Sequence, residues 1–189
     1  MTIYALSSGP GVSGVAIIRI SGSEASKVIK SLTSKEIPMP RMATLRKINN
    51  INTSELIDEG IILWFPGPES YTGEDMAEIH IHGGKAVVLA VQNEIAKHKN
   101  CRLAEPGEFT KLALQNGKIN LLKAESIADL ISAETEIQRL QAVKIMKGKS
   151  SSGKSIFASI NDKIFSNFSL NSSNFCDDVP FIIFIACNL

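Results

Sequence analysis

A strict two-residue alternation from Met76 to His82 restricts the possible folds more than any other feature of the sequence. One set of alternate positions is apolar, and the other set is Met76, Glu78, His80 and His82. Because successive side chains of a β-strand point to opposite faces, this pattern predicts a strand with one apolar face and one ionisable face. Gly83 and Gly84 follow, and an apolar stripe at helical spacing then predicts a helix containing Val88, Val91 and Ile95.

Further strands and a short helix are predicted before this segment. The turn-rich stretch Ser7 to Gly14 leads into the apolar, β-branched run Val15 to Ile20, which predicts a buried strand. Ile61 to Phe65 predicts a second strand, stopped by the prolines of Pro66 to Pro68. Ser23 is expected to cap a short helix that runs to about Ser31. Strands and helices in this order indicate the α+β class.

The C-terminal half of the sequence is predicted to be helical. Asn116 and Gly117 suit the end of a short helix, and Asn120 can cap the next one. Apolar residues recur at helical spacing from Ala124 to Leu140, with no Gly or Pro before Gly148, so we predict one long helix there. A weaker stripe from Ile156 to Phe168 predicts a second helix. The two would pack as a helical hairpin.

Composition is that of an ordinary soluble globular protein. The chain has 189 residues, 44% of them hydrophobic and 21% charged, and a formal net charge of +1, which gives no nucleic-acid footprint. Its three cysteines are widely spaced and odd in number, which argues against a disulfide framework and favours a reducing cytoplasm. The apolar run Phe181 to Ala186 is far shorter than the ~20 residues that span a bilayer, so no membrane is expected.

Arg19 lies inside an apolar strand, where an unpaired guanidinium is very costly. It should therefore meet a carboxylate or an anionic ligand, and Glu78 is the natural candidate. The residues alone leave two interpretations open. One is an internal ion pair that only holds two strands together. The other is a ligand pocket between those strands.

His80 and His82 share the predicted polar face with Glu78, an arrangement that could suit a metal ion. Three ligands on one short strand are geometrically demanding, and no further His or Cys lies at ligand spacing. Hydrogen-bonded histidines are therefore favoured over a metal site. Gly83 and Gly84 could hold an anion at a helix start, but two glycines also suit a tight turn.

The segment Gly148 to Ser155 matches the phosphate-loop pattern G-x-x-x-x-G-K-[ST]. Taken literally, it would put Lys154 on phosphates and Ser155 on magnesium. The preceding residues are predicted to end a helix rather than a buried strand, and the remaining ~34 residues are too few for a nucleotide-binding core. We therefore expect no GTP, Mg²⁺ or K⁺ on this chain.

Three stretches resemble the signature segments of the MnmE (TrmE) family of tRNA-modifying GTPases. They are PGVSGVAIIRISG (Pro10 to Gly22), LWFPGPESYTGEDMAEIHIHGG (Leu63 to Gly84) and AEPGEFTKLALQNGKINLLKAESIADLI (Ala104 to Ile131). The resemblance implies a folate-binding and dimerisation domain over residues 1–117, with a tetrahydrofolate-binding fold like that of the glycine-cleavage T-protein. It implies part of a helical domain over residues 118–180, and residues 181–189 form an apolar tail outside the family pattern.

The resemblance also implies a cofactor site with no catalytic residue of its own. Arg19, Glu78 and Lys118 fall in the family's folate-contacting motifs, and the implied ligand is 5-formyltetrahydrofolate or a related reduced folate. These residue types suit that ligand, because a carboxylate accepts two hydrogen bonds from an amino-pyrimidinone edge and the cations suit the folate's carboxylates or carbonyls.

Intact members of the family are expected to form homodimers and to act with the flavoprotein MnmG. Together these install a 5-carboxymethylaminomethyl-type group on the wobble uridine of tRNA. The family's GTPase domain and C-terminal cysteine motif have no counterpart in these 189 residues. The leading hypothesis is thus a folate-binding module. Its alternatives are a free-standing folate-dependent one-carbon transferase and an inactive remnant.

Overall fold

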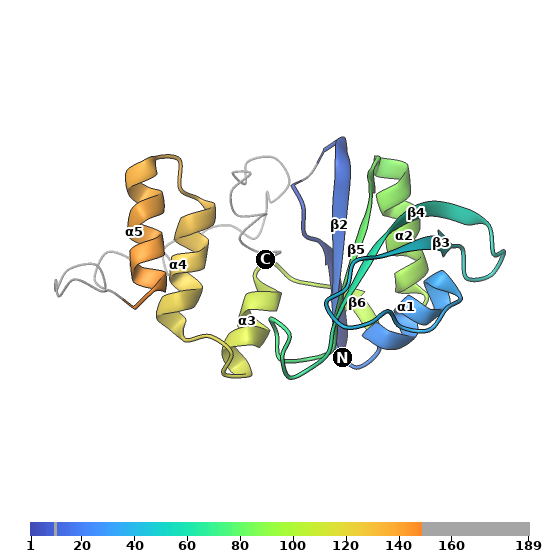
Figure 1. Ribbon diagram of the computed structural model, residues 1–189, viewed down its shortest axis with the longest axis horizontal. Coiled ribbons are helices and arrows are strands. Elements are labelled where there is room, and N and C mark those ends of the chain that lie inside the picture. Colours follow the sequence, from blue (N-terminus) through green and yellow to red (C-terminus); the bar gives the residue numbers. More distant parts are fainter. Residues whose placement is uncertain (10, 149–189) are drawn as a thin grey trace, which may run out of the picture.

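The computed structural model describes residues 1–9 and 11–148, and within them a single six-stranded sheet forms the centre of the molecule (Figure 1). The strand order is β3-β4-β5-β2-β1-β6, and every neighbouring pair is antiparallel except the parallel β1 and β6. The strands are β1 (Thr2–Leu6), β2 (Ser13–Ser21), β3 (Thr44–Asn49), β4 (Leu56–Phe65), β5 (Met76–Gly83) and β6 (Cys101–Leu103).

Five helices accompany this sheet in the described part of the chain. Helices α1 and α2 lie against one face, and α3 lies on the other side with α4 and α5 beyond it (Figure 1). The helices are α1 (Ala25–Thr33), α2 (Lys85–Ala96), α3 (Glu108–Gln115), α4 (Leu121–Ile131) and α5 (Glu136–Met146). The predicted α+β class is therefore confirmed.

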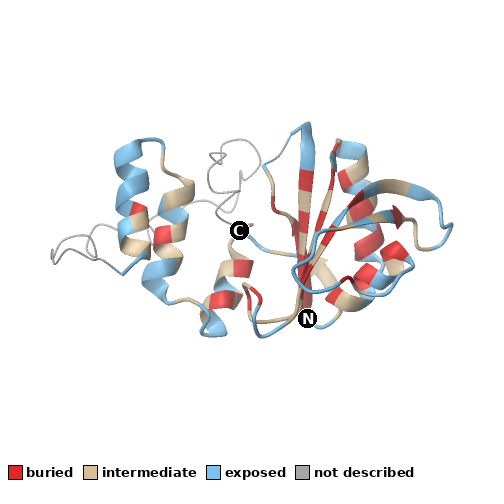
Figure 2. Ribbon diagram, viewed as in Figure 1, coloured by how far each residue is buried: buried red, intermediate tan, exposed pale blue. Residues whose placement is uncertain are grey.

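The main hydrophobic core lies between the sheet and the two helices α1 and α2. Ile18, Ile20 and Ile79 are fully buried there, as are Val91 and Ile95 of α2. Figure 2 shows these buried positions gathered along the central strands and the inner sides of the two helices. The apolar face predicted for the 76–82 alternation is thus the face that α1 and α2 cover.

A second, smaller core lies on the opposite face of the sheet, at its β1 side. Ile3 and Ala5 of β1 pack against Phe109 of α3, which is fully buried. The β3 and β4 side of this same face is more open. Leu45 and Ile61, which are paired across those strands, are 62% and 38% exposed. We call the face opposite α1 and α2 the open face.

The first helix does not begin as predicted. Ser23 was expected to cap it, but α1 begins at Ala25 and Glu24 occupies the capping position without a side-chain cap. Instead, the Glu24 backbone N–H donates to Thr2 Oγ1 at 2.9 Å. A backbone donor at the start of α1 is therefore paired by a side chain of β1. The local sequence does not reveal this tertiary contact.

The prediction of one long helix from Ala124 to Leu140 was wrong. The segment divides into α4 and α5, which pack side by side as a hairpin, with Thr135 capping α5. Gln138 N–H donates to Thr135 Oγ1 at 3.3 Å, and Thr135 N–H donates to Gln138 Oε1 at 2.9 Å. This capping box starts a new helix without any Gly or Pro.

Smaller expectations at the helix ends are confirmed. Asn120 Oδ1 accepts a hydrogen bond from Lys123 N–H at 2.8 Å, and Gly117 has a left-handed φ of 67° after α3.

Among residues 1–148 apart from Pro10, no helix is long and apolar enough to cross a bilayer. The residues outside the described part include the expected second helix from Ile156 to Phe168, the phosphate-loop match beyond Gly148, and the 181–189 tail.

Candidate functional site

The register of the two central strands sets Arg19 and Glu78 side by side on the open face. Arg19 of β2 lies directly opposite Glu78 of β5. Their strand neighbours Ile18 and Ile79 point into the main core. Because side chains alternate along each strand, the two charged groups share the opposite face, clear of α1 and α2.

The two side chains form the predicted ion pair. Arg19 Nε and one terminal nitrogen both donate to Glu78 Oε1, at 3.0 and 2.7 Å. The side chains are only 12% and 15% exposed, so the pair is largely withdrawn from water. Both of these bonds end on one carboxylate oxygen. The second oxygen, Oε2, therefore keeps most of its capacity to accept hydrogen bonds.

Two aromatic rings frame the guanidinium. The central carbon of Arg19 lies 5.8 Å from the centroid of Tyr71 and 5.7 Å from that of Phe109. The Tyr71 hydroxyl is 3.0 Å from Thr110 Oγ1, which ties its loop to α3. Rings at this distance favour a cation. The sequence analysis missed both aromatics, although each lies in a stretch that carried the family resemblance.

The loop between β4 and β5, residues 66–75, is anchored to the end of β2. Ser21 Oγ lies 2.7 Å from Thr72 Oγ1, and Gly22 N–H donates to Asp75 carbonyl at 2.9 Å. Ser21 Oγ also donates to a Glu74 carboxylate oxygen at 3.1 Å. The loop that carries Tyr71 is therefore held in place beside Arg19.

Lys118 meets this loop from the other side. Its Nζ donates to the Pro68 carbonyl at 2.8 Å, and the neighbouring Asn116 Nδ2 donates to the Thr72 carbonyl at 2.7 Å. A Cβ added at Gly73 would lie 3.3 Å from the Asn116 side chain and 3.4 Å from that of Lys118. The fold thus brings Arg19 and Glu78 into direct contact, whereas Lys118 joins them through the 66–75 loop.

The two histidines of β5 turn to different carboxylates. His80 Nε2 lies 3.4 Å from Glu78 Oε2, and the imidazole is 24% exposed. His82 is 72% exposed, and its Nδ1 lies 2.8 Å from Asp58 Oδ1. His82 is thus hydrogen-bonded to Asp58, and His80 lies at the outer limit of hydrogen bonding from Glu78. In the part of the chain that the structure describes, no three His, Cys, Asp or Glu side chains are grouped to hold a metal ion.

Asp58 is held in its charged form by its neighbours. Burial acts to raise the pKa of this carboxyl, but hydrogen bonds from the His82 backbone and side chain and from Glu59 N–H outweigh it, so the pKa is lowered. Its other oxygen accepts from His82 N–H at 2.9 Å. Asp58 therefore secures the end of β5. Gly83 follows His82 at this end of the strand. A Cβ added at Gly83 would lie 2.5 Å from the Ser13 carbonyl oxygen, so the close approach of β2 and β5 requires glycine there.

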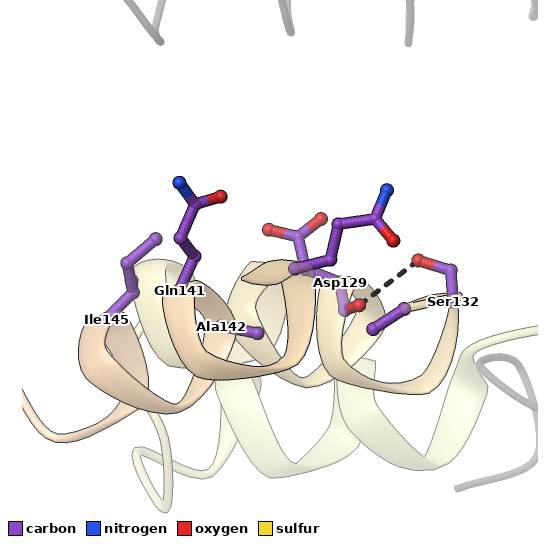
Figure 3. Close-up of a pocket in the computed structure, with 7 residues that line it drawn as sticks. Asp129, Ser132, Gln141, Ala142 and Ile145 are labelled. Carbon is purple, nitrogen blue, oxygen red and sulfur yellow. Dashed lines mark hydrogen bonds between the residues drawn. The ribbon is translucent and has the colours of Figure 1, made fainter. Parts of the chain in front are cut away.

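A separate hollow lies on the α4–α5 hairpin, away from these residues. Its volume is about 290 Å³, and its lining is Asp129, Ser132, Ala133, Gln138, Gln141, Ala142 and Ile145. Asp129 and Gln141 project to the same side of the hairpin (Figure 3). Burial raises the pKa of Asp129. None of the site residues predicted from the sequence, Arg19, Glu78 and Lys118, lines this hollow.

The fold and site together define a class of protein. It is a mixed α+β domain whose open sheet face carries an arginine–glutamate pair framed by aromatic rings, followed by a helical hairpin. Residues 2–118 match the sequence model of the family described as "GTP-binding protein TrmE N-terminus". The chain belongs to this TrmE N-terminal family.

Similarity to curated relatives extends over more residues than the family model matches. The chain is 78% identical over 150 residues to the tRNA modification GTPase MnmE of Pelagibacter ubique (strain HTCC1062), covering 79% of this chain and 34% of that protein. It is 50% identical over 147 residues to the mitochondrial 5-taurinomethyluridine-tRNA synthase subunit GTPB3 of Danio rerio, covering 78% and 29%. The human protein of that name is 47% identical over 149 residues, covering 78% and 30%. The chain thus spans about a third of the length of the curated relatives it matches.

Proposed function

We propose that this chain is a reduced-folate-binding module that works in tRNA modification. The observation that carries the proposal is the Arg19–Glu78 pair on the open face, largely buried yet leaving Glu78 Oε2 with accepting capacity. The aromatic frame of Tyr71 and Phe109 stabilises the guanidinium with or without a ligand, so the remaining accepting capacity of Glu78 Oε2 is the feature that favours a ligand site. A heteroaromatic ligand with N–H donors would use that capacity.

The residue chemistry fits a reduced folate such as 5-formyltetrahydrofolate. Glu78 would accept hydrogen bonds from the ligand's amino-pyrimidinone edge, and Arg19 would keep that carboxylate charged and oriented. Lys118 would add a cation for the ligand's carboxylates or carbonyl oxygens, at the loop that also carries Tyr71. When bound, the folate supplies a one-carbon unit. The chain's own residues bind and orient it.

The larger assembly is part of the same proposal. We assign the folate module to residues 1–117, with a tetrahydrofolate-binding fold, and the start of a helical domain to residues 118–180. Support for a role in tRNA modification comes from the family and from the names of the relatives. Within that role we propose a cytoplasmic homodimer, an MnmG-like flavoprotein partner and a tRNA modified at its wobble uridine.

Calorimetric titration with 5-formyltetrahydrofolate tests the binding site. Glu78→Gln keeps the shape of the side chain but removes its charge, and loss of charge-assisted hydrogen bonds should weaken binding by about 1.5 to 3 kcal/mol. Arg19→Ala and Lys118→Ala should also weaken it. The matched control is Glu59→Gln, the same chemical change at an exposed position of the adjacent strand β4, which should bind like the native chain. Unchanged affinity in both Glu78→Gln and Arg19→Ala would refute the assignment.

A further inference from the structure

Asn116 is a polar side chain at the end of α3 that bonds the 66–75 loop but belongs to none of the proposed ligand contacts. The helix before it is fixed to the sheet, because Phe109 of α3 is fully buried against β1. The chain after it is bound to the same helix, since Lys118 N–H donates to the Ala113 carbonyl at 2.8 Å. The Asn116 side chain therefore starts from a fixed end of α3.

The acceptor of this side chain is the Thr72 carbonyl. Asn116 Nδ2 donates to it at 2.7 Å, and the bond is partly buried. Thr72 is itself fully buried, and its hydroxyl lies 2.7 Å from Ser21 Oγ at the end of β2. Thr72 is thus held between the sheet and α3. The ring centroid of Tyr71, the residue before it, lies 5.8 Å from the central carbon of Arg19.

Two other side chains donate to carbonyls of this loop, but both bonds are exposed. Arg41 donates to the Glu69 carbonyl at 2.6 Å, and Lys118 Nζ donates to the Pro68 carbonyl at 2.8 Å. Water competes with exposed bonds of this kind, so they contribute little to the position of a loop. A shielded bond is stronger, and its loss leaves an acceptor unpaired. Of these three bonds, the one from Asn116 is best shielded from water.

We propose that Asn116 is a positioning residue that sets the spacing between Lys118 and the Arg19–Glu78 pair. The inference rests on the proposed folate function, in which one ligand contacts both parts of the site. The loop joins these parts, because one of its carbonyls accepts from Lys118 Nζ and its tyrosine ring lies beside the guanidinium.

A ligand that spans both parts binds more tightly when their spacing is fixed beforehand. Without the bond from Asn116, the loop occupies the binding position for only part of the time. The apparent affinity then falls in proportion to that fraction.

Calorimetric titration with 5-formyltetrahydrofolate measures the effect on binding. Asn116→Ala removes the amide without adding charge, and the affinity should fall about three- to tenfold. Asn93→Ala is the matched control, the same change at an exposed position of α2, and should bind like the native chain. Glu94→Gln disturbs a buried carboxylate of α2 and should lower stability with the affinity unchanged. The two controls separate positioning from a general loss of stability.

A spectroscopic readout tests the position of the loop without any ligand. The Arg19 guanidinium lies near the Tyr71 and Phe109 rings, so their ring currents affect the NMR chemical shift of Arg19 Nε–H. In Asn116→Ala this signal should move towards its position in Tyr71→Leu, which lacks one of the two rings. In Asn93→Ala it should keep the native position.

The outcomes separate the inference from the proposed function. Native affinity in Asn116→Ala, with binding still dependent on Glu78, overturns the role of Asn116 alone. An Arg19 signal that stays at its native position in Asn116→Ala also overturns that role, whether or not the folate binds. A native chain that does not bind the folate overturns both the function and the inference.

A second variant and the native chain itself keep the test open if Asn116→Ala fails to fold. Asn116→Asp keeps the size of the side chain but puts a carboxylate oxygen where the amide donated, and the same two readouts apply. In the native chain, the side-chain amide protons of Asn116 should exchange with water more slowly than those of Asn93. Equal exchange rates overturn the inference.

Discussion

At the scale of single residues, one buried carboxylate can satisfy several hydrogen-bond donors at once. Glu94 of α2 illustrates this away from the candidate site. Its side chain is only 6% exposed, and it accepts hydrogen bonds from Asn50 Nδ2 at 3.0 Å, Ile51 N–H at 2.9 Å and Lys97 Nζ at 2.6 Å. One carboxylate thus ties the turn after β3 to α2. Such a hub is costly to disturb because its partners would lose their acceptor.

Glu94 should make stability depend on pH. Burial acts to raise the pKa of Glu94, but hydrogen bonds from Lys97 and Ile51 outweigh it and lower the pKa. A carboxyl with a lowered folded-state pKa contributes stability above its ordinary value of 4.5, and this contribution is lost as pH falls through the folded-state value. Glu94→Gln should therefore reduce the free energy of unfolding in urea by about 1 to 3 kcal/mol at neutral pH, with a smaller difference in acid.

The control for Glu94 lies in the same turn. Glu55 is exposed, so Glu55→Gln should change the free energy of unfolding by less than about 0.5 kcal/mol at any pH. A Glu94→Gln variant as stable as the Glu55→Gln variant at neutral pH would contradict the role of Glu94 as a hub.

Elements in this chain begin and end through side-chain contacts as much as through Gly and Pro. The break between α4 and α5 depends on the Thr135–Gln138 capping box, and the start of α1 depends on Thr2 of a different strand. The first signal was present in the sequence as a Thr followed three residues later by Gln. It was missed because the apolar residues from Ala124 to Leu140 recur at helical spacing across the break.

Thr135→Ala should loosen α5 specifically. Removing a helix N-cap costs about 0.5 to 2 kcal/mol, so the amides of α5 should exchange with solvent faster while those of α2 keep their protection. Ser132→Ala changes another hydroxyl of the same connection, which donates to the Asp129 carbonyl at 3.3 Å, and should leave α5 unaffected. Unchanged exchange in Thr135→Ala would show that packing of the hairpin, not the cap, holds α5 in place.

At the scale of the whole molecule, the two faces of the sheet are unequally covered. One face is sealed by α1 and α2. The open face carries the ion pair and, towards the β3 edge, the exposed pair Leu45 and Ile61. Adjacent exposed apolar side chains suit a protein contact more than a solvated surface. A second copy of the chain is the occupant we propose, in line with the family resemblance.

Self-association should therefore weaken when charge is placed on this surface. In sedimentation equilibrium the native chain should be a dimer, and Leu45→Glu should shift it towards monomer at micromolar concentration, because a carboxylate would have to lose its water in the contact. Leu89→Glu is the matched control, since Leu89 is 57% exposed but belongs to α2, on the covered side of the sheet. A monomeric native chain, or equal weakening by both changes, would refute this surface.

The sequence by itself determined the alternating strand around Glu78, the buried strand around Arg19 and the helix of Val88, Val91 and Ile95, and it made Glu78 the candidate partner of Arg19. These followed from local periodicity and from the cost of burying an unpaired charge, which are properties of the chain alone. It did not reveal the strands β1, β3 and β6, whose short or mixed segments become strands by pairing with distant residues.

Only the tertiary structure decided how the ion pair is surrounded. Tyr71 and Phe109 reach Arg19 from a loop and a helix far apart in sequence, and Lys118 meets the same loop from beyond α3. The division of Glu78 between Arg19 on one oxygen and His80 on the other likewise depends on rotamers that periodicity cannot specify. Periodicity assigns a side chain to a face, whereas packing between distant segments determines its partners.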